Sequence, residues 1–145
     1  MFSKACEYGI KSSIYLAQQA LKTENKINVQ EIATSVNSPE AFTAKVLRNL
    51  VENKILYSSK GPNGGFFVPK EKLSEIRLSE IVSAIDGDEV YTGCGLGLEA
   101  CDDNRPCPLH DKFIVVREEL RKTLEATTLL ELANGIDSGL TFLKR

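Results

Sequence analysis

The sequence lacks the marks of membrane, secreted and disordered proteins. No apolar run approaches the ~20 residues that a membrane-spanning helix requires. The first residues, MFSKACEYGIKSS, have neither a long apolar core nor the small-residue cleavage site of a secretory signal. Internal repeats and low-complexity segments are absent as well. With 42% apolar and 26% charged residues among 145, the composition predicts a folded cytoplasmic protein with no membrane partner.

The sequence also has little that an enzyme would use. His110 is the only histidine, and it has no evident nucleophilic partner apart from Cys107. The glycines of GPNGGF, residues 61–66, are expected in a hairpin rather than before a helix, so they do not form a nucleotide-binding loop. We therefore expect a binding protein and not an enzyme.

Each half of the chain is short of one sign of charge. Residues 1–72 carry ten Lys/Arg and six Asp/Glu, whereas residues 73–145 carry eight and fourteen. A basic first half predicts a surface for a polyanion such as nucleic acid, and an acidic second half predicts a separate role. A solvated helical surface would give a similar balance, so the charge alone does not decide.

Apolar spacing predicts two neighbouring helices in the first half, after an opening helix over residues 3–22. Asn28 and Glu31 form a capping box that begins a short helix ending near residue 35, and Ser38-Pro39 begins a longer one. A short helix, a tight turn and a longer helix are typical of a helix-turn-helix, although two ordinary packed helices share the pattern. In the longer helix, the predicted inner face holds Phe42, Val46, Leu47 and Leu50, and the polar outer face holds Glu40, Thr43, Lys45, Arg48 and Asn49.

A β-hairpin is predicted directly after the longer helix. The segments 55–59 and 66–68 are β-prone, and the turn residues 60–65, KGPNGG, join them. A hairpin in this position is a wing, and Lys60 beside Gly64 and Gly65 would let its tip approach a phosphate closely. A plain tight turn would explain the two glycines equally well.

The second half is predicted to contain a short helix over 79–85, an irregular segment and a long helix over about 108–127. The long helix has an apolar stripe of Phe113, Val116, Leu120 and Leu124, which either packs on its own domain or forms a dimer seam. A short final helix begins at the capping box of Thr128 and Glu131. The expected fold is mostly α with a small β-hairpin wing: a winged helix-turn-helix domain (1–87), a sensor loop (88–107) and a dimerisation helix with a C-terminal segment (108–145).

Three of the four cysteines lie in the irregular segment. Cys94, Cys101 and Cys107 are followed by His110, at the start of the long helix. In a reducing cytosol such residues are metal ligands or redox thiols rather than structural disulfides. Thiolates and imidazole bind both zinc and iron–sulfur clusters. A cluster, a structural zinc site, a redox thiol pair and scattered thiols with no joint role all remain open at this point.

Several segments together resemble the Rrf2 family of bacterial winged-helix transcription regulators. The matching segments, in chain order, are SKACEYGIKSSIYLA, INVQEIATSVNSPEAFTAKVLRNLVENKILYSSKGPNGGFFVP, RLSEIVSAIDGD and CGLGLEACDDNRPCPLHDKF. The resemblance implies a homodimer with crossed C-terminal helices that binds a pseudo-palindromic operator in double-stranded DNA. By position, it implies DNA contacts from Ser38, Glu40, Thr43, Lys45, Arg48, Lys60, Asn63, Gly64 and Gly65.

The resemblance also implies an iron–sulfur cluster, because sensing members of the family have cysteines at the positions of Cys94, Cys101 and Cys107. In IscR-like members the fourth ligand is a histidine, here His110, which would favour a 2Fe–2S cluster. In NsrR-like members it is a carboxylate of the partner's first helix, here Glu7, which would favour a 4Fe–4S cluster. CymR-like members lack these cysteines and are a poorer match.

We therefore expect a transcription regulator, and more specifically a repressor, whose cluster senses redox state, nitric oxide or iron–sulfur status. A cluster-free thiol/disulfide regulator and a zinc-stabilised DNA-binding module are the alternatives.

Overall fold

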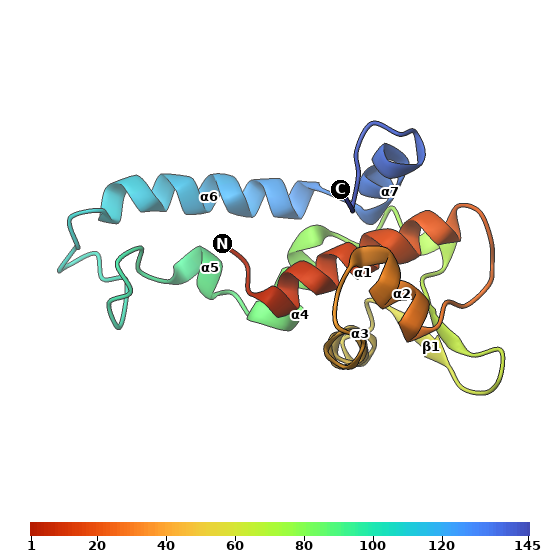
Figure 1. Ribbon diagram of the computed structural model, residues 1–145. Helices are drawn as coiled ribbons and strands as arrows, with labels where there is room; N and C mark the ends of the chain where they lie inside the picture. Colours follow the sequence, from red (N-terminus) through yellow and green to blue (C-terminus); the bar gives the residue numbers. More distant parts are fainter.

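The computed structural model describes all residues, 1–145, and is mostly helical, as predicted. Figure 1 shows a group of helices with a small hairpin on one side, and a long helix that extends away from it beside an irregular loop. The elements are α1 (Lys4–Ala20), α2 (Val29–Val36), α3 (Glu40–Glu52), β1 (Tyr57–Ser59), β2 (Gly65–Phe67), η1 (Lys70–Lys72), α4 (Leu78–Asp86), α5 (Glu89–Thr92), α6 (His110–Ala126) and α7 (Leu129–Asp137).

The predicted capping residues begin two of the helices. The Asn28 side chain accepts a hydrogen bond from the Glu31 backbone amide at 2.9 Å, at the start of α2. The Thr128 hydroxyl accepts from the Glu131 amide at 3.2 Å, at the start of α7. Each bond satisfies one of the amides that the first turn of a helix leaves free. Asn37 then ends α2 in the left-handed conformation, which an asparagine tolerates better than most residues.

The two short strands pair in antiparallel register, with Tyr57 opposite Phe67 and Ser59 opposite Gly65. The hairpin is attached to the helices by a bridge between Ile27 and Phe66, whose backbones exchange hydrogen bonds of 2.9 and 2.8 Å. Two strands alone are marginally stable, so this anchorage holds the hairpin beside α2 and α3.

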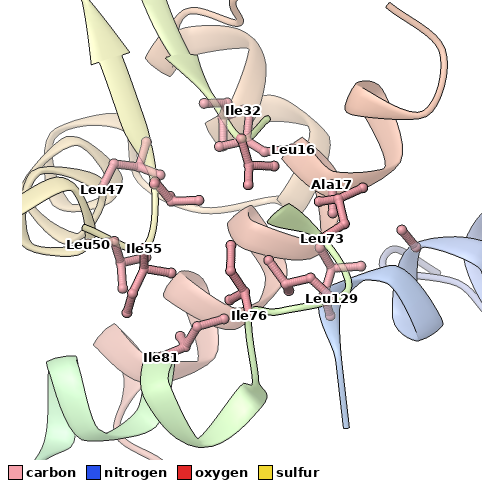
Figure 2. Packing of buried hydrophobic residues seen from close by; sticks show 14 of the residues in the cluster. Leu16, Ala17, Ile32, Leu47, Leu50, Ile55, Leu73, Ile76, Ile81 and Leu129 are labelled. Atoms are coloured by element: carbon pink, nitrogen blue, oxygen red, sulfur yellow. The ribbon is translucent and has the colours of Figure 1, made fainter. Parts of the chain in front are cut away.

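One apolar core joins most of the elements. Its fully buried members include Leu16 of α1, Ile32 of α2, Leu47 and Leu50 of α3, and Leu129 of α7. Figure 2 shows these side chains converging from helices that lie far apart in the sequence. We call this unit, formed by α1–α4, the hairpin and α7, the main lobe. It holds both α3 and the hairpin.

The C-terminal segment returns to the main lobe after α6. Backbone hydrogen bonds join Leu78 to Thr127 at 2.9 Å and Leu129 to Ile76 at 3.0 Å, around a bridge between Arg77 and Thr128. The predicted C-terminal region, residues 108–145, therefore contains two helices with different surroundings. The helix α6 projects from the lobe, whereas α7 packs against α1 within the core.

A second, smaller cluster attaches α6 to the lobe. It consists of Cys6, Val82, Tyr91 and Leu124, all less than 9% exposed. Tyr91 lies on α5, a short helix in a segment that was predicted to be irregular throughout. Of the predicted stripe on α6, Val116 does not pack on its own domain, because it is 58% exposed while Arg117 faces inward. Leu124 is buried and Phe113 and Leu120 are half-buried, as the stripe requires.

Candidate functional site

The exposed face of α3 carries three of the residues predicted to contact DNA. Glu40, Lys45 and Arg48 are all exposed, and the opposite face of the helix is anchored by Val46, Leu47 and Leu50. An exposed helix with its apolar side fixed in a core can enter the major groove of DNA, where base edges are readable. The positive charges of Lys45 and Arg48 suit phosphate contacts.

Thr43 is a correction to the predicted outer face. Its side chain is completely buried, and its hydroxyl donates a hydrogen bond of 2.7 Å to the carbonyl of Pro39. The half-buried Ser38 hydroxyl lies 2.6 Å from the Thr43 hydroxyl, so these two residues bond to each other at the start of α3. Ser38 was also expected to cap the helix, but Pro39 occupies the cap position and no side chain caps it. Thr43 has no surface to offer to a base.

Phe42 is a second correction: it was predicted to lie on the inner face of α3, but its side chain is partly exposed. It is 38% exposed and stacks edge-on against Tyr8 of α1, with the ring centroids 5.7 Å apart. Since Thr43 turns inward, the neighbouring Phe42 lies at the edge of the helix and not in the core.

The wing tip places Lys60 and Asn63 in solvent, as predicted. The two adjacent glycines have a reason within the chain itself. A Cβ atom on Gly64 would lie 2.3 Å from the Ser59 carbonyl oxygen, and one on Gly65 would lie 2.5 Å from the Ile27 carbonyl oxygen. Gly65 also has a φ of +148°, which side chains disfavour. The plain-turn interpretation therefore explains the glycines, and their contact with DNA stays a prediction.

The cysteine loop, residues 93–109, joins α5 to α6 and brings the predicted ligands together as two pairs. The sulfur atoms of Cys94 and Cys107 lie 3.8 Å apart, and the Cys101 sulfur lies 3.3 Å from Nδ1 of His110. All three cysteines are half-buried and free. No set of three or more ligand-type side chains converges on one point. Each of Cys107 and His110 is thus paired with an earlier cysteine.

His110 is held in one orientation. Its ring is 7% exposed, and Nε2 lies 3.0 Å from the carboxylate of Asp103. A carboxylate acceptor at Nε2 favours the tautomer with the proton there, which leaves the Nδ1 lone pair directed at Cys101. This arrangement resembles that of histidine ligands, whose second nitrogen usually donates to a carboxylate or carbonyl.

Cys94 lies in surroundings that favour its thiolate. Backbone amides of Leu96 and Leu98 hydrogen-bond to its sulfur and lower the pKa of the Cys94 thiol, and the charge of Arg117 contributes in the same direction. Cys94 and Cys101 share a surface hollow of about 860 Å³ with the carboxylates of Asp86 and Glu89. By contrast, Cys6 is fully buried, and burial raises the pKa of its thiol to about 12.

Glu7, the alternative fourth ligand, lies on α1 and pairs with Lys4 at 2.8 Å. The hydrogen bond from Lys4 lowers the pKa of the Glu7 carboxyl group. No contact joins Glu7 to the cysteine loop of its own chain, so its ligand role requires a second chain.

Arg117 and Asp103 are site residues that the pattern analysis missed. Arg117 donates to the sulfur of Cys101 at 3.3 Å and to the carbonyl of Gly93. The sequence could have indicated Arg117, because it lies two helical turns after the candidate ligand His110 on the same face of one helix. No sequence rule distinguishes Asp103 from its neighbour Asp102.

Comparison with known proteins now bears on these observations. A family model described as "Rrf2: Iron-dependent Transcriptional regulator" matches residues 2–135. The chain belongs to the Rrf2 family. Among relatives, a protein named as an HTH-type transcriptional regulator in Aquifex aeolicus is 31% identical over 136 residues, which cover 92% of both chains. The Rrf2-family regulator IscR of Serratia proteamaculans is 26% identical over 114 residues, covering 79% of this chain and 68% of its own.

Solved structures of Rrf2-family proteins share the fold. CymR of B. subtilis, described as the global cysteine regulator, aligns with a TM-score of 0.73 at 22% identity, covering 92% of this chain and 96% of its own. T. potens IscR aligns with the same TM-score at 17% identity, covering 97% and 91%. Since both match equally well, the fold alone does not separate a CymR-like from an IscR-like member.

Membership in the Rrf2 family confirms three predictions: the winged-helix fold, DNA binding and a role in transcription regulation. It also confirms that the protein is not an enzyme, because the family consists of regulators. None of the helices has the length and apolar character needed to cross a membrane.

Proposed function

We propose that this chain is a homodimeric repressor that binds a pseudo-palindromic operator and responds, through an iron–sulfur cluster on the cysteine loop, to redox state, nitric oxide or iron–sulfur supply. One observation carries the cluster assignment. Three free thiols and one oriented imidazole nitrogen lie in contacting pairs on a single loop, Cys94 with Cys107 and Cys101 with His110. The loop connects α5 to α6 along the chain, so its state can affect the position of α6.

The donor set fits a cluster chemically. Amide hydrogen bonds to the Cys94 sulfur and a buried Arg117 Nε without any acceptor both suit bound sulfur of negative charge. Cys94, Cys101, Cys107 and His110 would hold the group, which supplies reversible one-electron chemistry when bound. His110 is favoured over Glu7 because its free nitrogen already faces Cys101, which corresponds to a 2Fe–2S cluster.

The decisive measurement is anaerobic purification followed by an absorption spectrum and iron, sulfide and zinc analysis of one sample. We expect visible bands with matching iron and sulfide, lost in the variant His110→Ala and retained in Glu7→Ala. Loss in Glu7→Ala alone would instead identify the partner's carboxylate and a 4Fe–4S cluster. Zinc in place of iron would leave a zinc-stabilised DNA-binding module.

A second candidate function has one observation in its favour. The Cys94 and Cys107 sulfur atoms, 3.8 Å apart, need little movement to form a disulfide when an oxidant accepts their two electrons and two protons. A colourless, metal-free protein that loses two free thiols and changes its DNA affinity with peroxide would support this thiol switch. Unchanged thiol count and affinity would eliminate it.

The DNA interface that we propose combines α3 with the wing: Glu40, Lys45 and Arg48 on the helix, Lys60 and Asn63 at the tip, and the backbone around Ser38, Gly64 and Gly65. Phosphate contacts supply most of the affinity and make it depend on salt.

Arg48→Ala and Lys45→Ala should each weaken binding to an operator duplex and reduce the slope of log affinity against log salt by about 1. Lys22→Ala is the control, since Lys22 is an exposed cation that pairs with Asp137 at 3.3 Å.

The dimer that we propose forms through α6. Three consecutive branched aliphatic residues of this helix, Ile114, Val115 and Val116, are 40%, 63% and 58% exposed. Such an apolar patch on a projecting helix is suited to a second copy of the chain. Two copies would place two α3 helices on half-sites about 34–36 Å apart. Sedimentation equilibrium should show the Val115→Glu variant as a monomer. The control Leu140→Glu, which alters an exposed apolar residue outside α6, should remain a dimer.

A further inference from the structure

Arg117 is an arginine without a carboxylate partner. It lies on the inward face of α6, and no Asp or Glu oxygen is within 4 Å of its guanidinium group, whereas the neighbouring Arg121 pairs with Glu118 at 3.7 Å. Partly buried arginines are usually paired, because removing their charge from water is costly. The anionic partner of Arg117 must therefore come from elsewhere in its surroundings.

Those surroundings consist of the cysteine loop. One terminal nitrogen of Arg117 donates to the carbonyl of Gly93, which precedes Cys94, and the other donates to the Cys101 sulfur at 3.3 Å. The side chain thus joins α6 to both ends of the segment that contains the first two candidate ligands. A guanidinium group can do this because its donors have a fixed planar arrangement, which a lysine lacks.

The third guanidinium nitrogen of Arg117, Nε, is buried, and its N–H has no acceptor. Leaving such a donor unpaired costs about 1–3 kcal/mol, so the position is suited to an acceptor that arrives with a ligand. The Cys101 sulfur accepts from Arg117 at 3.3 Å, and the charge of Arg117 also acts on the Cys94 thiol. Anionic sulfur is therefore the acceptor that this site would take.

We propose that Arg117 is the positioning residue for the bound sulfur centre: its guanidinium compensates the negative charge of the cysteine sulfurs and cluster, and it ties that charge to the dimer helix α6. This inference rests on the proposed cluster function. A cation and hydrogen-bond donor beside the sulfurs of a cluster stabilises its reduced, more negative form, and so raises the reduction potential. Loss of the cluster would remove the acceptor of the Arg117 Nε–H, while the bonds of Arg117 to Gly93 and Cys101 would remain.

The test compares three variants of the full-length chain. Arg117→Gln removes the charge, and Arg117→Lys keeps the charge without the planar donors. Arg105→Gln removes an exposed cation of the cysteine loop. We expect the cluster midpoint potential of Arg117→Gln to shift to more negative values, with Arg117→Lys intermediate and Arg105→Gln unchanged. A wild-type potential in Arg117→Gln would overturn the proposal.

A second readout does not depend on the cluster. In metal-free protein, hydrogen exchange of the amides of residues 93–101 should be ~10-fold faster in Arg117→Gln than in the wild type, with α1–α4 unchanged. Equal exchange in this segment would show that Arg117 does not hold the loop. If the wild type bound no cluster at all, the proposed function would fail, and the exchange experiment would still decide whether Arg117 secures the loop.

Discussion

The main lobe and the cysteine loop are built on different principles. The lobe is held by apolar side chains from five helices and the segments between them, such as Leu16, Leu47 and Leu129, which are at most 1% exposed. The loop has no such residue: Leu96 and Leu98 are 50% and 55% exposed, and its contacts are made by sulfur, imidazole and guanidinium groups. Apolar burial therefore specifies the shape of the lobe, whereas the loop depends on polar and charged contacts that a ligand or an oxidant can change.

The largest expected effect concerns burial. Leu129→Ala, in α7, should reduce the free energy of unfolding by about 2–5 kcal/mol, because a fully buried leucine leaves a cavity in the core. Leu98→Ala makes the same chemical change in the loop and should alter the free energy of unfolding by less than about 0.5 kcal/mol. Urea denaturation measures both. Equal effects would mean that α7 is not part of the lobe's core.

This contrast also explains what could be predicted from the sequence. Apolar periodicity identified the helices α1 to α4, α6 and α7, and turn residues between β-prone segments identified the hairpin. Asn28 and Thr128 were recognised as caps because their hydrogen bonds are local. The inward turn of Thr43 depends on its bond to Pro39, which replaces water as a partner and which no period reveals. The pairing of Cys94 with Cys107 depends on the three-dimensional path of the loop, so spacing indicated the ligands but not their partners.

The next effect concerns the wing, which is attached to the lobe by backbone contacts. Gly65→Ala should destabilise the protein by more than about 2 kcal/mol, since its Cβ would lie 2.5 Å from the Ile27 carbonyl at an unfavourable φ. Gly61→Ala has a positive φ of +100° but open space around it, and should cost only about 1–2 kcal/mol. The difference in urea midpoint isolates the contact between the wing and Ile27. Matching midpoints would show that this contact is dispensable.

A smaller effect separates the two kinds of cysteine. Burial raises the pKa of the Cys6 thiol from 9.0 to about 12, so the folded protein keeps this proton after the unfolded chain has lost it. Stability should therefore decline as the pH rises above 9, by up to about 1.4 kcal/mol per pH unit. In Cys6→Ala that contribution disappears and the alkaline decline becomes shallower. The control Cys94→Ala, in the loop, should retain the full decline; a wild-type slope in Cys6→Ala would contradict the assignment.

The smallest effect is that of a single cap. Asn28→Ala should cost about 1 kcal/mol of stability, because it leaves the Glu31 amide at the start of α2 without its side-chain acceptor. Asn63→Ala at the exposed wing tip changes the same residue type without loss of a hydrogen bond and should be neutral. Thermal unfolding of the pair is sufficient to measure this difference. An equal change in both would attribute the effect of Asn28 to something other than capping.

Because the chain returns to the main lobe at Thr128, a single cleavage of the backbone should not separate the two parts of the protein. If the peptide chain were cut once within the cysteine loop, the first fragment would keep α1 to α5 and the second would keep α6 and α7. Each fragment would still have its own attachment, because Leu129 and Ala133 of the second lie in a core formed with the first. The two fragments would therefore migrate as one species on a native gel and separate only under denaturing conditions. A cut in the cysteine loop would thus leave the two fragments associated without a covalent link.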